Sequence, residues 1–507
     1  MITVNIEAVK VDDFSAGFGT KVSALGYPPN MSPSCLNVVP KVLKGLSKRN
    51  GYLLIAAGIP DTYSLLEWKV SDSVNRIIAT SGTALKYMDN LSGSWTTALG
   101  ADLNSGAYYD FTFTSYGDSV YLLMTSSERD NLLQMNSSGL LAAVSDSPFG
   151  KYIIEWENYI FIGNLSDGSS DMKYSAIGNY TSWPSDNREY LSTKFGDQVR
   201  GFAVLKRRLY VFKDWSIHRY SFLGGTPTFQ KDSLLGIGTI SYKTIQEIDI
   251  ADMGKFLIFL GTDGRVYIFD GYNPPQDVSD IITYDNRSKV NLGKLNRTYM
   301  SKAVGINYRD LKWYVLFYPQ TDSNTVGLIF DYSRKPLSIW PIDNHFVQAI
   351  AECTNSLSIK KPFFVDPNGN LFEFDKGNTD NVTAINSYWR SPRYEIGSSQ
   401  ILKQGYQLSL PVKTVGRNSL TFKYRENWND AWITCDNIYQ ASNNIDLLGE
   451  TFVLGQSKLG GEEVFENIID IPSLSNLIQF EISDNSTNRP WTVYKLEQII
   501  EKIGIGG

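Results

Sequence analysis

The sequence has little of the side-chain chemistry on which many enzymes depend. Its 507 residues include two histidines, His218 and His345, and three cysteines, Cys35, Cys353 and Cys435. Two histidines exclude a multi-histidine metal centre, and a Ser-His-Asp triad would have to use one of them. Three cysteines far apart form no disulfide framework and suit a reducing cytoplasm. We expect His218 to be partly buried in a strand and His345 to be exposed in a turn.

Long apolar runs and an excess of positive charge are also missing. No stretch approaches 18 uninterrupted apolar residues, and the N-terminus lacks a basic start with an apolar region behind it. We therefore expect neither membrane insertion nor a secretory signal. The formal net charge is -6, whereas a general nucleic-acid-binding face needs an excess of lysine and arginine. This balance argues against tight DNA binding but permits a surface past which DNA slides.

Aromatic residues and glycines are abundant, with 30 Tyr, 25 Phe, 11 Trp and 41 Gly. Aromatic side chains fit pleated, half-buried surfaces, so the composition favours an all-β protein. The clearest local signal is the segment GKFLIFLGTDGRVYIFDGYN, in which two apolar strands flank a turn at Asp263 and Gly264. A second segment, PFFVDPNGNLFEFD, repeats the pattern around Asn368 and Gly369. Both predict antiparallel hairpins with structural turns at these four residues.

Hairpins of this kind recur through the middle of the chain. Their starts lie 39 to 57 residues apart, at Ile77, Val120, Tyr159, Leu209, Phe256, Trp313 and Phe363. A β-propeller blade of four strands uses about 40 to 50 residues, so the spacing predicts a propeller of about seven blades, with six to eight open. We expect the aromatic-rich strands to be the inner ones. Neither the WD dipeptide nor the kelch double glycine repeats here.

The two ends of the chain differ from the middle. Residues 1–52 carry Pro28, Pro29, Pro33 and Pro40, which predict an extended N-terminal arm that crosses the protein's own surface or docks on a neighbouring subunit. Residues 53–380 would form the propeller. After them, residues 381–507 alternate apolar and polar positions in short stretches, which predicts a smaller, β-sandwich-like accessory domain.

One pair of carboxylates needs separate consideration, because some propellers are glycosidases. Glu155 and Glu157 are two residues apart and would share one face of a strand, compatible with acid-base work. A solvent-facing strand edge produces the same pattern and is the preferred interpretation. Lys206-Arg207-Arg208 is interpreted as a solvated strand end. Trp428 and Trp432 could be sandwich core or a contact surface. We therefore predict no catalytic, cofactor-binding or metal-binding residue, no cofactor and no enzymatic activity.

The arm also carries a resemblance to a known family. Its residues in order are Phe14, Gly17, Thr20, Ser23, Pro29, Ser32, Asn37, Gly45, Leu46, Lys48, Arg49, Gly51 and Tyr52. This order resembles the N-terminal arm of tailed-bacteriophage virion proteins, in which a Phe-Gly-Gly-Leu-Asn-Thr type stretch precedes a proline-rich turn and a Lys-Arg-x-Gly element. Ala16 and Phe18-Gly19 depart from that wording. Trp389-Arg390-Ser391-Pro392 and Pro490-Trp491 are similar to the C-terminal region of propeller-type phage tail proteins.

The resemblance is to the tail nozzle, or tail hub, family (tail tubular protein B-like) of short-tailed phages. It implies a structural virion protein that forms a ring, usually a homo-hexamer, below the head-to-tail adaptor. Such a ring continues the DNA channel, lets double-stranded DNA pass transiently, helps to retain the genome and anchors tail spikes or fibres. Synthesis would occur in the host cytoplasm and the final location would be the virion. The candidate inter-subunit residues of the arm are Phe14, Gly17, Thr20, Pro29, Arg49 and Tyr52.

Two alternatives stay open at this point. A receptor-binding or glycan-cleaving tail protein would need an aromatic-lined groove, with two carboxylates at glycosidase separation if it cleaves. Another capsid- or baseplate-associated scaffold would share the rigid propeller and differ in its place and copy number.

Overall fold

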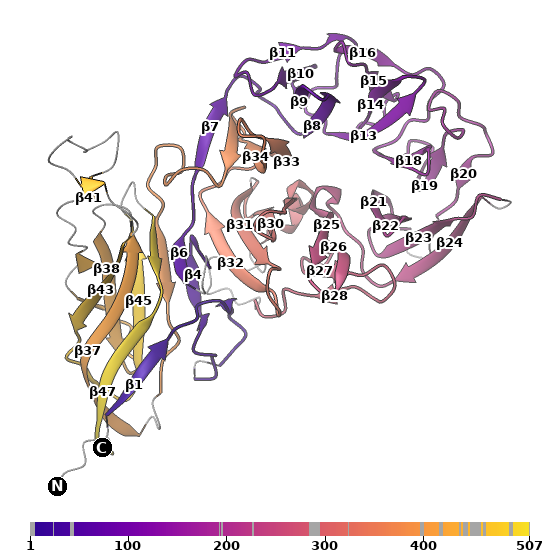
Figure 1. Ribbon diagram of the computed structural model, residues 1–507. Helices are drawn as coiled ribbons and strands as arrows, with labels where there is room; N and C mark the ends of the chain where they lie inside the picture. Colours follow the sequence, from indigo (N-terminus) through magenta and orange to yellow (C-terminus); the bar gives the residue numbers. More distant parts are fainter. Residues whose placement is uncertain are drawn as a thin grey trace.

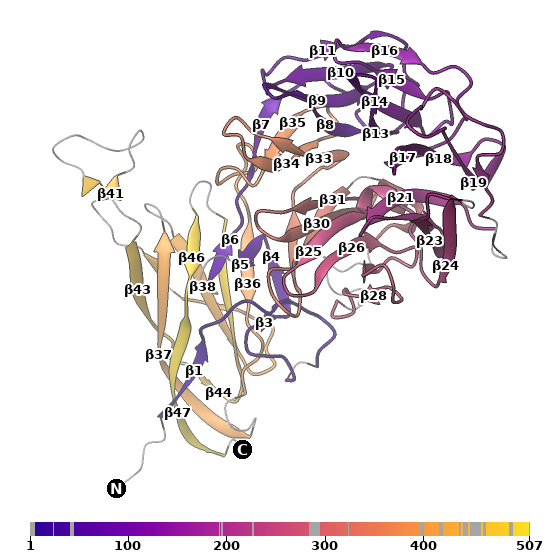
Figure 2. The same ribbon diagram turned by 45° about the vertical axis from the view of Figure 1, so that its right-hand side comes forward.

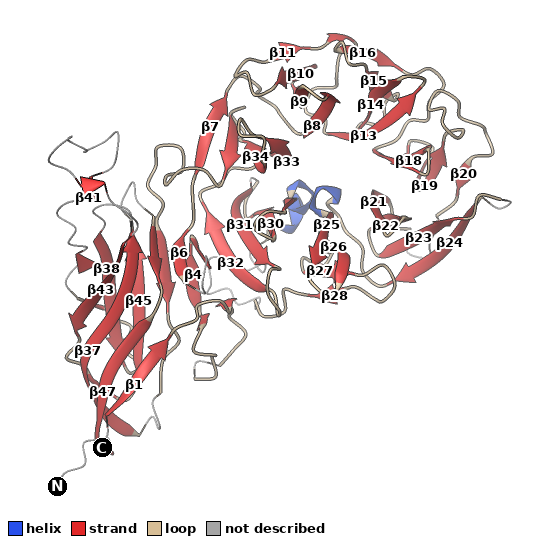
Figure 3. Ribbon diagram, viewed as in Figure 1, coloured by secondary structure: helices blue, strands red, loops and turns tan. Residues whose placement is uncertain are grey.

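Short antiparallel strands joined by turns account for most of the chain (Figure 1). The computed structural model describes residues 6–505 apart from 24, 41–44, 192, 194–195, 226–227, 283–294, 323, 396–399, 415–418, 436–437, 440–444, 447–457, 460–462 and 486–489. Within these residues, helix is confined to two short 3-10 segments, η2 (Tyr242–Thr244) and η4 (Arg297–Lys302). Figure 3 draws helix in blue, on the inner side of the ring beside β25. In the same part of the chain, no helix is long and apolar enough to span a membrane.

Seven sheets of the described residues form a closed ring, the β-propeller that the hairpin spacing predicts. Each blade begins with the strand nearest the axis, and these innermost strands are β8 (Leu65–Ser71), β13 (Tyr109–Tyr116), β17 (Tyr152–Trp156), β21 (Val199–Leu205), β25 (Gln246–Ile250), β29 (Val304–Tyr308) and β33 (Ala349–Thr354). The second strands are β9 (Val74–Ser81), β14 (Ser119–Ser126), β18 (Tyr159–Leu165), β22 (Arg208–Lys213), β26 (Gly254–Leu260), β30 (Trp313–Pro319) and β34 (Lys360–Val365).

The two outer positions of each blade complete its antiparallel sheet. The third strands are β10 (Ala84–Asp89), β15 (Leu133–Met135), β19 (Gly168–Tyr174), β23 (Ser216–Phe222), β27 (Val266–Phe269), β31 (Asn324–Asp331) and β35 (Leu371–Phe374). The fourth strands are β11 (Thr96–Thr97), β16 (Leu140–Ala143), β20 (Arg188–Glu189), β24 (Phe229–Leu235), β28 (Gln276–Asp277), β32 (Ser338–Asp343) and β7 (Tyr52–Ala56). A fifth strand, β12 (Leu99–Gly100), runs parallel to β16.

The aromatic-rich strands are the second strands of the blades, next to the innermost ones and inside each sheet. Every predicted hairpin start falls in a second strand, where burial is most complete; β30, for example, is buried along its whole length. A second strand has a sheet neighbour on both sides and a blade against each face. Each large apolar side chain buried there contributes about 1.5–3 kcal/mol, which explains why these strands dominate the sequence signal.

The ring is closed by a strand from the other end of the chain. β7 pairs with β35, so the seventh blade combines residues 52–56 with residues 349–374. Buried apolar residues then join this blade to the first, among them Ile59 and Leu65 on one side and Phe363 and Val365 on the other. Closure by distant segments gives the ring no free edge between its first and last blades.

Most of the remaining strands form two sheets that lie beside the ring, and we call these two sheets the sandwich (Figure 2). One sheet contains β1 (Ile6–Val11), β47 (Leu496–Ile505), β37 (Ile401–Thr414), β46 (Trp491–Val493), β6 (Leu46–Lys48), β5 (Val38–Pro40), β43 (Glu463–Asp470) and β44 (Leu474–Ser475). The other contains β39 (Ile433–Thr434), β38 (Ser419–Glu426), β45 (Ile478–Asp484), β36 (Ser387–Arg390), β4 (Ser34–Leu36) and β40 (Ile438–Tyr439). Two short parallel pairs are β2 (Gly17–Phe18) with β3 (Met31–Ser32) and β41 (Ile445–Asp446) with β42 (Lys458–Leu459).

Residues from the N-terminal segment are built into both of these sheets. β1 pairs with β47, β6 pairs with β46, and β4 pairs with β36. The segment therefore contains short strands and crosses the protein's own surface, the first of the two predicted arrangements. One continuous apolar cluster includes Phe14 of this segment, Phe480 of the sandwich and Trp340 of the sixth blade. Ring and sandwich thus share a core.

Candidate functional site

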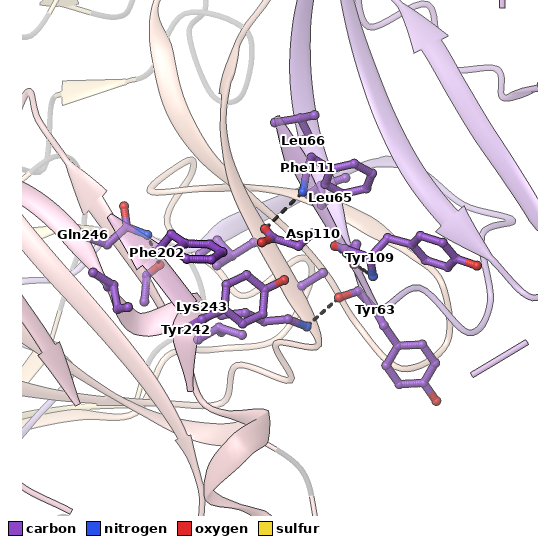
Figure 4. A pocket seen from close by; sticks show the side chains of 16 residues that line it. Tyr63, Leu65, Leu66, Tyr109, Asp110, Phe111, Phe202, Tyr242, Lys243 and Gln246 are labelled. Carbon is purple, nitrogen blue, oxygen red and sulfur yellow. Dashed lines mark hydrogen bonds between the residues drawn. The ribbon is translucent and has the colours of Figure 1, made fainter. Parts of the chain in front are cut away.

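A cavity of about 260 Å³ lies on the axis of the propeller (Figure 4). Six of the seven blades contribute to its wall through residues in or next to their innermost strands. Its polar lining includes Ser64, Asp110, Lys243 and Gln246. The cavity is therefore where the blades converge, and it is the first place to look for a bound molecule.

The helical turn η2 narrows this axis. It precedes β25 and carries Tyr242 and Lys243, whose Nζ donates to the Tyr63 carbonyl oxygen at 2.7 Å. The ring of Tyr242 lies 5.1 Å from that of Tyr152 and 5.6 Å from that of Tyr108, centroid to centroid. Side chains of the fifth blade thus reach across to the first, second and third blades.

Asp110 is the acidic group of the cavity. Its two carboxylate oxygens accept hydrogen bonds from the backbone N–H of Ile153 at 2.9 Å and of Phe111 at 3.1 Å. Burial raises the pKa of Asp110 to about 7, although both hydrogen bonds and the Lys243 charge favour ionisation. Burial likewise lowers the pKa of Lys243 to about 8, opposed by Asp110. Desolvation is thus the dominant influence on both groups.

Similar polar contacts join neighbouring innermost strands. Ser64 Oγ donates to the Tyr109 carbonyl oxygen at 2.7 Å, and the Glu155 N–H donates to Thr112 Oγ1 at 3.0 Å. Gln246 Nε2 donates to the Gly305 carbonyl oxygen at 3.1 Å. Asp110 belongs to this set, because its bond to Ile153 ties the second blade to the third. The cavity's polar groups serve the closure of the ring.

The chemistry available in the cavity is limited. Asp110 is the one carboxyl group among the described residues that line it, whereas glycosidases use two. No group of three histidine, cysteine, aspartate or glutamate side chains that could hold a metal ion occurs in the described part of the chain. A volume of about 260 Å³ holds roughly nine waters at about 30 Å³ each. The contacts of Lys243 with Tyr63 and of Tyr242 with Tyr152 also cross the axis, so a DNA duplex, whose major groove alone is about 12 Å wide, cannot pass.

A second site joins the N-terminal segment to the rest of the protein, and we call it the clamp: Lys48, Arg49, Asp380 and Asp484. Arg49 Nη1 and Nη2 each lie 2.7 Å from an oxygen of Asp380, and Lys48 Nζ lies 2.8 Å from Asp484 Oδ2. All four side chains are at most 3% exposed. Arg49 also donates to the Asp343 carbonyl oxygen at the end of the sixth blade. The clamp therefore connects the sandwich to the ring.

The six candidate arm residues all contact other parts of the same chain. Phe14 packs edge-on against Trp389, and a Cβ at Gly17 would lie 2.8 Å from the Ile339 carbonyl oxygen. The Thr20 N–H donates to the Ile281 carbonyl oxygen. The Pro29 carbonyl oxygen accepts from Tyr394, Arg49 pairs with Asp380, and Tyr52 begins β7. A contact of these residues with another subunit stays a prediction.

The four turn residues occupy equivalent positions in the fifth and seventh blades. Gly264 and Gly369 adopt φ of +85° and +80°, and their N–H groups close turns on the carbonyl oxygens of Gly261 and Asp366. Asp263 Oδ1 accepts from the backbone N–H of Arg265. Asn368 donates its N–H to Asp366 Oδ1. The Asp, Asn and Gly content of these loops thus has a structural explanation.

Two expectations about titratable residues are wrong. Glu155 lies on β17, but Glu157 and Asn158 form the two-residue turn to β18 with φ of 51° and 63°, so the two glutamates do not share a strand face. His345 is fully buried, with Nδ1 2.8 Å from the Asp343 carbonyl oxygen and its ring among Tyr52, Phe317 and Phe364. Burial lowers the pKa of His345 to about 3. His218, on β23, is also buried.

Sequence reasoning missed Asp110 and Lys243 of the cavity and Asp380 and Asp484 of the clamp. Asp110 sits in an ordinary alternating strand, YDFTF, and Lys243 in a short turn, so neither has a local motif. Asp380 and Asp484 have no signal of their own. Lys48 and Arg49 were noticed as part of a pattern, and that pattern could have suggested buried carboxylate partners.

Comparison with known proteins adds little. No family model matches the chain, and no curated protein matches it. A crystal structure of BBS1N in complex with ARL6DN, soaked with mercury, is similar over 65% of this chain and 98% of that chain, with 11% identity and a TM-score of 0.41. A second crystal of the same complex, soaked with lead, covers the same shares with 12% identity and a TM-score of 0.30.

Proposed function

We propose that the protein is a structural component of a tailed, short-tailed phage, and that copies of it form the ring of a tail nozzle or hub. The observation that carries the proposal is the clamp. Lys48, Arg49 and Gly51 belong to the element that resembles phage virion proteins, and they lie where sandwich and ring are joined. A Cβ at Gly51 would lie 1.8 Å from the Thr379 carbonyl oxygen, so this position requires glycine. The residues that carry the resemblance thus join the N-terminal segment, the sandwich and the ring into one rigid unit.

The small size of the axial cavity determines the path that DNA would take in this proposal. The axial cavity is too small for a duplex, so the genome would pass between copies arranged in a ring. A wall without a large positive excess lets a polyanion pass without holding it, in keeping with the formal net charge of -6. Each propeller then acts as a rigid block in the wall.

Copy number and position in the virion test this proposal. We would count the protein in purified particles by quantitative mass spectrometry and locate it by cryo-electron microscopy. About six copies on the tail axis below the adaptor support a nozzle. Copies in multiples of three on the periphery would support spikes, and hundreds on the capsid would support a decorating scaffold. Either result overturns the nozzle.

The glycan-cleaving alternative receives less support from the structure. The axial cavity offers a single carboxyl group, Asp110, and its hydrogen bonds hold two blades together. Hydrolysis of a host polysaccharide by the purified chain would nevertheless establish that alternative directly.

A further inference from the structure

The outer face of the six-stranded sheet carries two neighbouring hollows of about 410 and 360 Å³. Both are lined by Arg390 of β36. The larger one also contacts Arg393, Arg425 and Tyr27 of the N-terminal segment, and the smaller one contacts Lys423 of β38. We call this surface the arginine groove, defined by Arg390, Arg393, Lys423 and Arg425.

Tryptophan rings hold the guanidinium groups of this groove in place. The Cζ atom of Arg425 lies 4.7 Å from the ring centroid of Trp432, and that of Arg390 lies 5.4 Å from the same ring. Arg393 lies 4.8 Å from Trp428, whose side chain is 57% exposed. Stacking on an aromatic face orients a guanidinium plane while leaving its N–H edges able to bind an oxyanion.

The four cations of the groove share two carboxylates. Glu481 accepts from Arg390 at 2.7 Å and from Lys423 at 3.1 Å. Asp430 lies 3.2 Å from Arg425 and 3.6 Å from Arg393, and its side chain is 93% exposed. Strong hydrogen bonds between a cation and a carboxylate are about 2.7–2.9 Å long, so both contacts of Asp430 are loose. The larger hollow thus holds a weakly bound carboxylate at its mouth.

The arginines are also close enough to oppose one another. Burial lowers the pKa of Arg425, and the charges of Arg393 and Arg390 lower it further, opposed by Asp430 and Glu481. Arg393 Nε is buried and has no hydrogen-bond partner among the described residues. Cations so arranged gain from any further anion that can reach them.

We propose that the arginine groove is a docking site for an extended acidic segment of a partner protein. Carboxylates of that segment bind Arg393 and Arg425 in one hollow and Arg390 and Lys423 in the other, displacing Asp430. This inference goes beyond the proposed function and does not depend on it.

The shape of the groove favours a peptide over DNA. Along β45, the outward positions from Gln479 to Ser483 span about 14 Å at about 3.4 Å per residue, which is the length of a short extended segment with acids at alternate positions. A duplex presents phosphates over a much longer surface, while this groove is short and is bounded by the N-terminal segment. Arginine, tryptophan and tyrosine are also the residues that most often anchor protein interfaces.

Fluorescence anisotropy with a labelled Glu-Thr-Glu-Thr-Glu peptide tests the proposal on the full chain. Arg425→Gln and Arg393→Gln should each weaken binding about 10-fold, because each removes a charge-assisted contact. Asp430→Asn should tighten binding about 3-fold, because it removes the carboxylate that competes for the same arginines. Arg219→Gln, which removes one positive charge from the propeller, is the matched control and should change nothing.

Tighter peptide binding by Asp430→Asn would show that the arginines bind the peptide, because a purely structural role of the groove predicts no gain. The Asp430 side chain is exposed, so a folding defect would not explain a change in binding. Weaker binding by Asp430→Asn, or equal binding by wild type and Arg425→Gln, overturns the proposal. No peptide binding, with Arg425-dependent binding of a short DNA duplex or of inorganic phosphate, overturns the acidic segment in favour of a phosphate ligand. Peptide binding that is lost equally in Arg219→Gln overturns it as well, because attraction would then be unspecific.

Discussion

The clamp and the arginine groove use the same kinds of side chain in opposite ways. In the clamp, Lys48 and Arg49 are buried and each has a carboxylate of its own at 2.7–2.8 Å. In the groove, four partly exposed cations share Glu481 and Asp430, and the contacts of Asp430 lengthen to 3.2 and 3.6 Å. The difference lies in pairing and solvation, since both regions combine lysine and arginine with acids.

This difference suits the clamp to holding the fold together and the groove to binding a partner. A buried ion pair need not stabilise a fold more than apolar residues would, but removal of one partner leaves a charge in a place without water. An exposed, shared pair contributes little to stability and is easily rearranged. Substitutions in the clamp should therefore destabilise the fold strongly, whereas substitutions of the exposed groove carboxylate should have little effect on stability. The groove should also bind added anions.

The largest effect is expected when the clamp loses its arginine. Arg49→Met should lower the free energy of unfolding by about 3–5 kcal/mol, because Asp380 stays buried without its bidentate partner. Urea unfolding followed by tryptophan fluorescence measures the change. Asp430→Asn in the groove, where the carboxylate is 93% exposed, is the matched variant and should cost no more than about 1 kcal/mol. Equal losses in the two variants would remove the distinction between clamp and groove.

The sequence predicted the repeating part of the fold well. Each of the seven hairpin starts lies in the second strand of a blade, since burial on both faces leaves a continuous apolar and aromatic run. The innermost strands have a weaker apolar pattern in the sequence, because polar groups that join the blades, such as Asp110 and Ser64, lie in them or next to them. The innermost strand β21 alternates buried and half-buried positions, whereas β30 is buried along its whole length. The sequence of β21 is therefore less continuously apolar and is harder to recognise as a strand.

Contacts between segments that are far apart in the sequence could not be predicted from local sequence patterns. Arg49 and Asp380 are 331 residues apart, and Lys48 and Asp484 are 436 apart. Proline content predicted an extended N-terminal segment, but the pairing of its strands with residues near the other terminus has no short-range signature. His345 was misplaced for the same reason, because its aromatic neighbours come from four separate strands.

A smaller effect is expected at Asp110, a half-buried carboxyl group whose hydrogen-bond donors are backbone N–H groups. Its pKa is raised to about 7 in the fold, above about 3.9 in the unfolded chain. Between these values the folded state binds more protons, so this group makes stability fall as pH rises from about 4 to about 7. Asp110→Asn should remove roughly 2–4 kcal/mol of that pH dependence.

The measurement is urea unfolding of wild type and Asp110→Asn at several pH values across this window. His345 and His218, whose pKa values burial lowers to about 3 and about 4, make stability fall as pH drops below about 6.5. They occur in both proteins and cancel in the difference. A difference independent of pH would mean that burial does not raise the pKa of Asp110.

The smallest effect is expected at an exposed cation in a turn. Arg207 occupies the second position of the Lys206-Arg207 turn between β21 and β22 with φ of 63°, a left-handed conformation that glycine adopts without strain. Arg207→Gly should relieve about 1–2 kcal/mol of strain and lose about 0.5–1 kcal/mol because glycine has more freedom when unfolded. The variant should therefore be more stable by up to about 1.5 kcal/mol. Arg207→Ala loses the same charge but keeps the β-carbon and should bring no gain. Thermal unfolding of both variants is the measurement. If both variants are less stable than wild type, the exposed Arg207 stabilises the fold as the buried Arg49 does. The contrast between buried ion pairs and solvated cations would then be wrong.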